Sequence, residues 1–513
     1  FQGGTAANRG VVAAFELVTG KPITVPPHHE VTGAIGCAMI AREEHPDGPS
    51  RFKGFDTMSA LSYDIRSFEC HDCPNRCEIN RVTVEGEKPL FYGSRCEKFD
   101  VDRKSRRGDH LPDLFEERSE LLLASHSSSG AVRPGAPRVG VPRSLLFHDL
   151  YPLWHAVLAE LGCEIVLSEP TNKKIIHAGA EQSVAETCFP VKVALGHVLD
   201  LLEKDIDFIF LPSIVNLPKH DPRATDSFVC PYVQSFCYTV KSAAPIEARG
   251  VKILQPVWYL QIGERQVLPE IEKMARVLGA RPGDAKRALA AGEAALARFQ
   301  QACKRRGKEV LDGIAAGERA IAVVSRSYNG CDLGANLEIP RKLRNMGILP
   351  IPMDFLPLDE VELPEEWQNM YWRYGQRILC AAEIVASDDR LFPLYITNFG
   401  CGPDSFIHKF FRERLGGKPC LMIEVDEHSA DAGMITRCEA FLESIRNSDG
   451  RVGQGRRFIP VNIRRGEKRT VLVPNMSPHA FALAAAMTAA GMPAQVLPEP
   501  DEETLYWGRQ FTT

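Results

Sequence analysis

The strongest constraint on the fold is a strand–loop–helix–strand pattern that occurs three times along the 513 residues. It opens at Arg138, at Ala320 and at Thr470, each time with an apolar strand, a polar loop, an amphipathic helix and a second apolar strand. Strands that alternate with helices in this way form parallel sheets covered by helices. We therefore predict an α/β protein with several doubly wound units of the Rossmann or flavodoxin type.

The same pattern divides the chain into domains. Residues 138–318 form the first predicted α/β cluster domain, which ends in a long charged helical stretch, Pro282–Gly317. Residues 319–465 form the second, and residues 466–513 begin a third unit that is truncated. The Ser-, Gly- and Pro-rich stretch Ser125–Pro137 predicts a linker ahead of the first domain.

Two smaller segments precede these domains. Residues 60–105 hold a small cysteine module. Residues 1–44 show two helical patterns, Ala6–Gly20 and Val31–Glu43, separated by the strand-like Ile23–Pro26. This first segment is too short to fold alone. Because the sequence lacks an initiator Met and enters an ordered pattern at once, we expect the chain to be a fragment.

Composition narrows the functional class. A net charge of −5 with 44% hydrophobic and 25% charged residues is typical of a soluble globular protein and predicts neither nucleic acid nor a membrane as partner. The fifteen cysteines are odd in number, several have metal-ligand spacings, and no secretory signal precedes them. We therefore expect reduced thiols in a cytoplasmic protein. The glycine fingerprint GxGxxG is absent, which disfavours a Rossmann dehydrogenase.

Three scattered cysteines occupy equivalent places in the pattern. Cys188 and Cys230 each stand just before a proline that suits the first turn of a helix, and Cys401 lies between a strand and a helix. Ligands collect at the carboxyl ends of parallel strands, and a helix N-terminus favours a thiolate and an anionic cluster. Three thiolates there predict an iron–sulfur cluster. Two alternatives stay open: the cysteines are structural, or Cys237 replaces Cys230.

A second set of cysteines predicts a separate metal site. Cys70, Cys73 and Cys77 are followed by Cys96 across two strand-like segments and a turn. Four thiolates on such a knuckle and hairpin surround one tetrahedral metal site. Zinc and an iron–sulfur centre both accept four cysteines, so the spacing leaves the choice between them open.

Acidic residues and a histidine lie near the same predicted sheet edge. Glu427 and His428 belong to an acidic loop that follows a strand, and Asp404 lies three residues after Cys401. We predict these three as catalytic residues that relay protons to a reduced substrate. The alternative is a structural hydrogen-bond network or a salt bridge at a domain interface.

Other polar residues follow the first strand. His148, Asp149 and Tyr151 are expected to line the cleft, or else to form a helix start that is capped by Ser144. His197 falls within an amphipathic helix, where a hydrogen-bonded core histidine is the expected role.

Five segments stand out as motifs: Phe1–Asn8, Val141–Arg143, Cys188–Lys192, Phe399–Phe406 and Glu424–Gly433. Through them, nearly the whole chain resembles the large activator-related proteins of the 2-hydroxyacyl-CoA dehydratase family. In these proteins an ATP-binding activase segment is fused to dehydratase-subunit-like domains. Two features depart from the relatives: the turn after the strand at Ala320 is poorer in Gly and Pro, and a further cysteine motif would be expected downstream of Thr513.

The resemblance implies cofactors and partners. It implies a 4Fe–4S or double-cubane cluster on the three scattered cysteines, which receives electrons from an ATP-driven activase. Residues 1–44 would be the C-terminal remnant of the activase nucleotide domain, of the acetate-kinase and actin type. Gly3 and Gly4 would then contact ATP, but only together with an upstream domain. The implied partners are an activase segment or subunit, a second copy of the chain, and a small-molecule or acyl-CoA substrate.

We therefore predict an iron–sulfur electron-transfer or reductase component that passes low-potential electrons to a small substrate or a partner enzyme. Whether the chain is itself an enzyme stays open; if it is, it is an ATP-coupled oxidoreductase or a dehydratase activator. The rival hypothesis is a non-enzymatic, zinc-bearing module that docks to a dehydratase system or regulates it.

Overall fold

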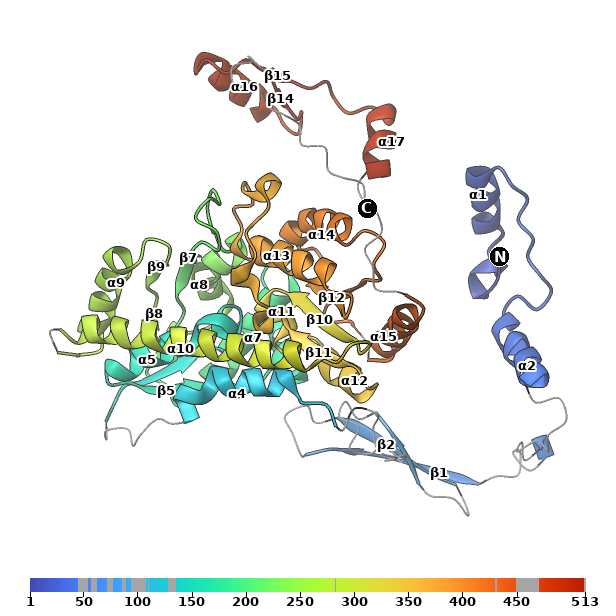
Figure 1. Cartoon of the computed structure of the whole chain (residues 1–513), viewed down its shortest axis with the longest axis horizontal. Coiled ribbons are helices and arrows are strands. Elements are labelled where there is room, and N and C mark those ends of the chain that lie inside the picture. The colour runs from blue at the N-terminus through green and yellow to red at the C-terminus, as the bar shows by residue number, and fades with distance from the viewer. Residues whose placement is uncertain are drawn as a thin grey trace. The chain divides into compact units, whose positions relative to one another are not determined.

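The computed structural model forms two compact units, one of residues 1–72 and 76–102 and the other of residues 73–75 and 103–513 (Figure 1). None of the helices that the structure describes is long and apolar enough to cross a membrane. The described residues are 1–44, 54–56, 62–71, 77–84, 89–93, 108, 110–127, 135–281, 283–429, 431–448 and 470–511.

The first unit contains two helices and a small antiparallel sheet. Helices α1 (Arg9–Thr19) and α2 (Thr32–Glu44) follow the short 3-10 helix η1 (Gly4–Ala7), which confirms both helical predictions to within three residues. The predicted strand Ile23–Pro26 is wrong: these residues form no strand, because the Ile23 N–H donates to Glu16 Oε1 at 3.0 Å rather than to a neighbouring strand, and proline has no N–H to donate. The sheet has the order β1-β2-β3, with strands Tyr63–Glu69, Glu78–Val84 and Leu90–Tyr92.

The second unit begins with a four-stranded parallel sheet of order β5-β4-β6-β8. Beyond it, a short parallel pair, β7 and β9, follows β6 and β8 along the chain. The strands are β4 (Arg138–Val141), β5 (Glu164–Leu167), β6 (Phe208–Phe210), β7 (Ser213–Asn216), β8 (Lys252–Leu254) and β9 (Val257–Tyr259). The helices between and after them are α5 (Phe147–Glu160), α6 (Lys173–Gln182), α7 (Phe189–Leu202), α8 (Pro231–Ala243), η2 (Glu247–Arg249) and α9 (Glu264–Val277).

A second parallel sheet repeats this arrangement in the order β11-β10-β12-β13. All eight residues of β12 are buried, as expected for a central strand covered by helices on both faces. The predicted α/β class with parallel sheets is therefore confirmed. The strands are β10 (Ala320–Ser325), β11 (Leu349–Pro352), β12 (Leu391–Asn398) and β13 (Leu421–Val425), and the helices are α11 (Ser327–Gly330), α12 (Ile339–Asn345), η3 (Met353–Phe355), η4 (Leu358–Glu360), η5 (Glu365–Trp367), α13 (Arg373–Ser387), α14 (Gly402–Leu415) and α15 (Asp431–Arg446).

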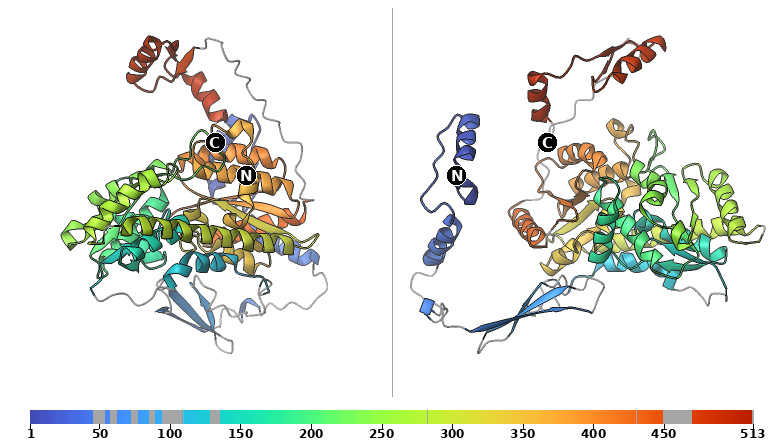
Figure 2. Two further views of the ribbon diagram at one scale, coloured as in Figure 1. Left: turned by 60° about the vertical axis from the view of Figure 1, so that its left-hand side comes forward. Right: turned by 180° about the vertical axis from the view of Figure 1, so that it is seen from behind.

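The second unit has two halves, the first built around the sheet β5-β4-β6-β8 and the second around the sheet β11-β10-β12-β13. One long helix contacts both halves. Helix α10 (Asp284–Gly313) has 30 residues, or about 45 Å at 1.5 Å per residue. Figures 1 and 2 show it running past α5, and near its C-terminal end it packs on η3. Two glycines allow this: a Cβ at Gly292 would lie 2.7 Å from Leu153 Cδ1 of α5, and one at Gly307 would clash with the Phe355 carbonyl oxygen.

Helix α4 (Leu114–Ser127) lies alongside α10 and packs on α5 as well. The predicted linker Ser125–Pro137 is therefore wrong in its first three residues, which continue this helix. The third predicted strand–loop–helix–strand pattern is found in residues 470–511. It consists of the parallel strands β14 (Val471–Val473) and β15 (Ala494–Val496), with helix α16 (His479–Ala489) between them. Helix α17 (Glu502–Phe511) follows.

Candidate functional site

The three scattered cysteines are the N-cap residues of three helices. Cys188 precedes α7, Cys230 precedes α8 and Cys401 precedes α14, and each helix has a proline in its first turn. The backbone N–H groups of Val191 and Asp404 are directed toward the thiols of Cys188 and Cys401 and lower their pKa values, although they fall short of capping geometry. The predicted placement of all three at helix starts is confirmed.

The thiol of Cys230 lies within electrostatic range of the thiols of Cys188 and Cys401. Burial raises the pKa of Cys188 to about 11 and that of Cys401 to about 12, and the thiol of Cys230 adds to both effects. Arg326 opposes the rise at both sites. All three thiols also act on the hydroxyl of Tyr328, whose pKa burial raises well above its usual value. Without a metal the thiols of Cys188 and Cys401 stay protonated near neutral pH, so metal binding to them must displace protons.

Among the residues that the structure describes, no three His, Cys, Asp or Glu side chains are close enough to hold one metal ion. A 4Fe–4S cluster takes each cysteine on a different iron, so its ligands stand further apart than those of one zinc ion. The N-cap cysteines suit the larger group, because helix N-termini also stabilise its negative charge.

Cys237 lies apart from this group. It is buried one turn or more inside α8, where Gln255 Nε2 donates to its sulfur at 3.4 Å. Burial raises its pKa, and Ser213, Lys241 and Gln255 lower it. Cys230 therefore has the better position of the two as a ligand, because its thiol alone acts on Cys188 and Cys401.

A buried ion pair stands at the start of the Cys401 helix. Arg326, directly after β10, donates to Asp404 Oδ1 from Nη2 at 2.8 Å and from Nε at 3.1 Å. Thr397 Oγ1 donates to the other oxygen, Oδ2, at 2.5 Å. Burial opposes ionisation of Asp404, but Arg326 outweighs it and the pKa is lowered. This predicted catalytic residue thus lies in a fixed ion pair, which favours the structural alternative.

Sequence reasoning missed Arg326 and Tyr328. Both belong to the turn that was noted only for departing from the relatives. Arg326 Nη1 lies 3.4 Å from the Tyr328 hydroxyl, and both side chains are buried. The available signal was a charged and an aromatic residue directly after an apolar strand of a parallel sheet, where ligands collect.

The other two predicted catalytic residues differ in their surroundings. Glu427 binds Lys192 Nζ at 2.7 Å, and the same nitrogen binds Glu186 at 2.6 Å. Burial opposes ionisation of Glu427, but Lys192 lowers its pKa. His428 has an exposed side chain, and its backbone N–H donates to Asp426 Oδ1 at 3.0 Å. Glu427 therefore closes a salt bridge between the loop after β13 and helix α7.

Polar side chains connect the carboxyl ends of the two sheets. Asp149, at the start of α5, accepts hydrogen bonds from Ser327 Oγ and Tyr374 Oη of the other half. Thr171, after β5, donates to Asp332 Oδ2 at 2.6 Å. These buried bonds hold together the edges at which the cysteines lie.

The histidines of this edge are core residues. His197 is fully buried, with Nδ1 2.8 Å from Ser168 Oγ and Nε2 2.8 Å from Thr171 Oγ1, which confirms the expected hydrogen-bonded role. His148 is buried too, on α5. The predicted cap by Ser144 is wrong, because α5 begins at Phe147 after Leu146, without a side-chain cap.

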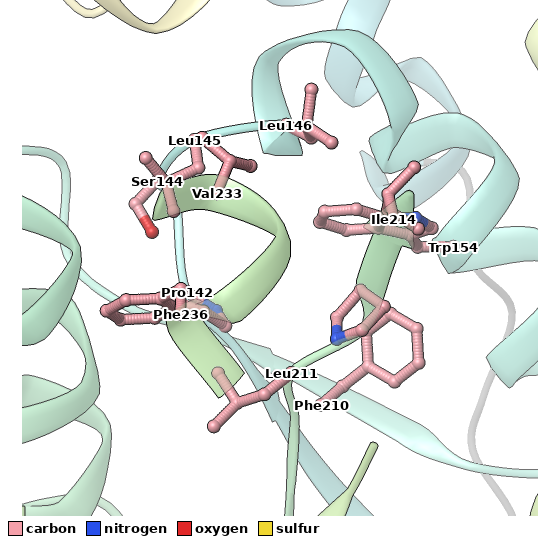
Figure 3. A pocket seen from close by; sticks show the side chains of 11 residues that line it. Pro142, Ser144, Leu145, Leu146, Trp154, Phe210, Leu211, Ile214, Val233 and Phe236 are labelled. Carbon is pink, nitrogen blue, oxygen red and sulfur yellow. The ribbon is translucent and has the colours of Figure 1, made fainter. Parts of the chain in front are cut away.

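A small apolar pocket lies at the carboxyl ends of β4 and β6 (Figure 3). Its volume is about 30 Å³, enough for one or two water molecules. Neighbouring strands whose connections leave in opposite directions open a crevice of this kind. One wall is α8, the helix that Cys230 caps. The lining residues are Pro142, Ser144, Leu145, Leu146, Trp154, Phe210, Leu211, Pro212, Ile214, Val233 and Phe236.

Half of the predicted four-cysteine module can be described. Cys70 and Cys77 are buried, and the N–H of Cys70 donates to the Cys77 carbonyl at 2.8 Å. Cys73 and Cys96 lie outside the described residues. The metal site and the choice between zinc and iron–sulfur stay predictions.

The predicted nucleotide contacts lie in the turn that opens the first unit. Gly3 has φ 87° and donates its N–H to the His29 carbonyl at 2.7 Å, and Gly4 begins η1. Side-chain space is open at both glycines. Their role in binding ATP stays a prediction.

Comparison with known proteins assigns part of the chain to a class. Residues 138–356, which contain Cys188 and Cys230, match the family described as the CoA enzyme activase uncharacterised domain (DUF2229). The chain thus carries a CoA enzyme activase-like domain, which agrees over residues 138–356 with the expected resemblance to acyl-CoA dehydratase activase-related proteins. No curated protein matches the chain.

Two solved structures are similar in part, both of the SBP FpvC from Pseudomonas aeruginosa. The one with Ni²⁺ is 12% identical and covers 61% of this chain and 96% of its own, with a TM-score of 0.19. The one with Mn²⁺ is 11% identical and covers 61% and 97%, with a TM-score of 0.20.

Proposed function

We propose that this protein is an iron–sulfur electron-transfer component related to 2-hydroxyacyl-CoA dehydratases and their ATP-dependent activators. The observation that carries the proposal is the group of three N-cap cysteines, Cys188, Cys230 and Cys401, which share one electrostatic neighbourhood at the carboxyl ends of two parallel sheets. Their presence in a chain with a CoA enzyme activase-like domain supports it.

In this proposal the three thiolates hold a 4Fe–4S or double-cubane cluster, which supplies a one-electron carrier. The N-termini of α7, α8 and α14 stabilise its negative charge through their backbone N–H groups. Tyr328 packs in the same buried neighbourhood and helps to exclude water. The hydrogen bonds of Asp149 with Ser327 and of Thr171 with Asp332 join the two halves and so fix the positions of the cysteine ligands relative to one another.

The partners follow from the class. An ATP-binding activase segment or subunit would deliver the electron, and a small molecule, an acyl-CoA or a partner enzyme would receive it. Residues 1–44 would belong to the activase segment, and a second copy of the chain would complete a homodimer. The four-cysteine module would carry zinc or a second iron–sulfur centre.

The test is iron and acid-labile sulfide content after anaerobic purification. We expect about four or more irons with matching sulfide at the junction site, which a Cys188→Ala, Cys401→Ala double variant loses. Cys230→Ala should lose them as well, while Cys237→Ala should keep them. Cys438→Ala is the control for loss of a thiol elsewhere in the fold, because Cys438 is buried on α15 rather than at the start of α7, α8 or α14. A wild type that contains zinc alone, retained in the double variant, would favour the docking module instead.

A further inference from the structure

The apolar pocket at the carboxyl ends of β4 and β6 has two side chains with polar atoms in its wall (Figure 3). Ser144 is 6% exposed, and its hydroxyl forms no hydrogen bond with the described part of the chain. Trp154 is 4% exposed, and among the described residues its Nε1 also has no hydrogen-bond partner. Because an unpaired buried polar atom costs free energy, atoms of this kind indicate a bound water or ligand.

The walls of the pocket suit carbon better than water. Ten of its eleven lining residues are apolar, and Ser144 is the eleventh. A water molecule in a cavity needs about two to four polar partners, whereas apolar cavities stay dry and take apolar ligands. A volume of about 30 Å³ holds roughly three heavy atoms, since bonded atoms lie closer together than separate water molecules.

The pocket adjoins the candidate site. Val233 and Phe236 of α8 line it, and the N–H of Val233 donates to the carbonyl of Cys230 at 2.9 Å. The pocket therefore begins within one turn of α8 from a candidate cluster ligand. Its other side is the turn after β4, where Leu145 has φ 51°, a left-handed conformation that a residue with a side chain adopts only at a cost. The carboxyl ends of neighbouring parallel strands are where such sheets bind ligands.

We propose that this pocket binds a small aliphatic molecule of about three heavy atoms that carries one hydroxyl or carbonyl oxygen. The carbon atoms lie against the apolar walls, and the oxygen accepts hydrogen bonds from the Ser144 hydroxyl and the Trp154 indole N–H. The binding needs no cluster. The use of this molecule as the substrate of the redox centre rests on the proposed function.

The experiment is saturation-transfer-difference NMR on the full chain, with ethanol as the probe and propane as its apolar counterpart of equal heavy-atom number. We expect Ser144→Ala to weaken ethanol binding about 2- to 10-fold, as for the loss of one hydrogen bond, and to leave propane binding unchanged. Trp154→Phe should likewise weaken ethanol binding more than propane binding. Trp258→Phe is the matched control, because Trp258 is buried and its Nε1 is unpaired within the described chain, but it does not line the pocket.

A second pair of variants tests the position of the ligand. Val233→Ile adds one methylene to the wall and should weaken both probes by about 10-fold or more. Val240→Ile is its control, since Val240 is buried further along α8 and does not line the pocket. If Val233→Ile does not fold, the comparison of Ser144→Ala with Trp258→Phe decides.

Three results would overturn the inference: no transfer to either probe in wild type, transfer that Val233→Ile leaves unchanged, or equal effects of Ser144→Ala on ethanol and propane. The first would mean that the pocket holds water only. Iron content is measured separately, so protein that binds ethanol but contains no iron would refute the proposed function and leave this inference standing. Protein with iron but without ethanol binding would do the reverse.

Discussion

The substitution Gly307→Ala tests how α10 joins the two halves that supply the cysteines. The helix approaches η3 so closely that a Cβ at residue 307 would meet the backbone of Phe355 rather than a flexible side chain. The helix or the turn must therefore move. Gly313, in the same helix, has nothing within 4 Å of its Cβ position and provides the matched control.

The magnitude follows from two opposing effects. Alanine in a helix interior is favoured over glycine by about 1 kcal/mol. Overpacking costs typically about 1–3 kcal/mol, and contact with backbone puts this site at the upper end. The net expectation is that Gly307→Ala loses about 2 kcal/mol of unfolding free energy, while Gly313→Ala gains up to about 1 kcal/mol.

The assay is urea unfolding followed by tryptophan fluorescence. Trp154 and Trp258 are buried in the first half of the unit and report its loss of packing. Gly307→Ala should unfold at lower urea than wild type, and Gly313→Ala at equal or higher urea. If Gly307→Ala proves as stable as Gly313→Ala, the close approach of α10 to η3 is refuted.

Two further predictions concern charge and pH. Glu427→Gln should lower the unfolding free energy by about 1 kcal/mol, and Glu186→Gln should lower it much less, in the same urea assay. Both carboxylates bind Lys192, but the side chain of Glu427 is 19% exposed and that of Glu186 is 89% exposed. Equal losses would contradict the salt bridge as described. Burial lowers the pKa of His148 and His197 to about 3, so both stay neutral in the folded chain and take up protons on unfolding below pH 6.5. Their contribution to stability is complete above pH 6.5 and is lost as the pH falls toward 3. His197→Gln should therefore flatten the rise in unfolding free energy between pH 5 and 7. An unchanged slope of unfolding free energy against pH would contradict this.

Local signals made much of the fold predictable. The apolar run of β12 and the proline after Cys188 or Cys230 act over a few residues, so the sequence predicts the strand and the helix starts directly. Arg326 could not be predicted in the same way, because its role depends on β10 and β12 lying side by side and on Asp404 far along the chain. The cap by Ser144 failed for a related reason, since Ser144 lies in the turn that lines the pocket and α5 begins only at Phe147.

The site combines two opposing physical effects. Burial raises the pKa of Cys188 and Cys401, and the same desolvation would disfavour every added negative charge on a cluster held there. A buried cluster site without compensating positive charge would be hard to reduce. The N-termini of α7, α8 and α14 would offset part of that penalty. The balance between burial and these helix N-termini would then determine how strong a donor must be to deliver the electron.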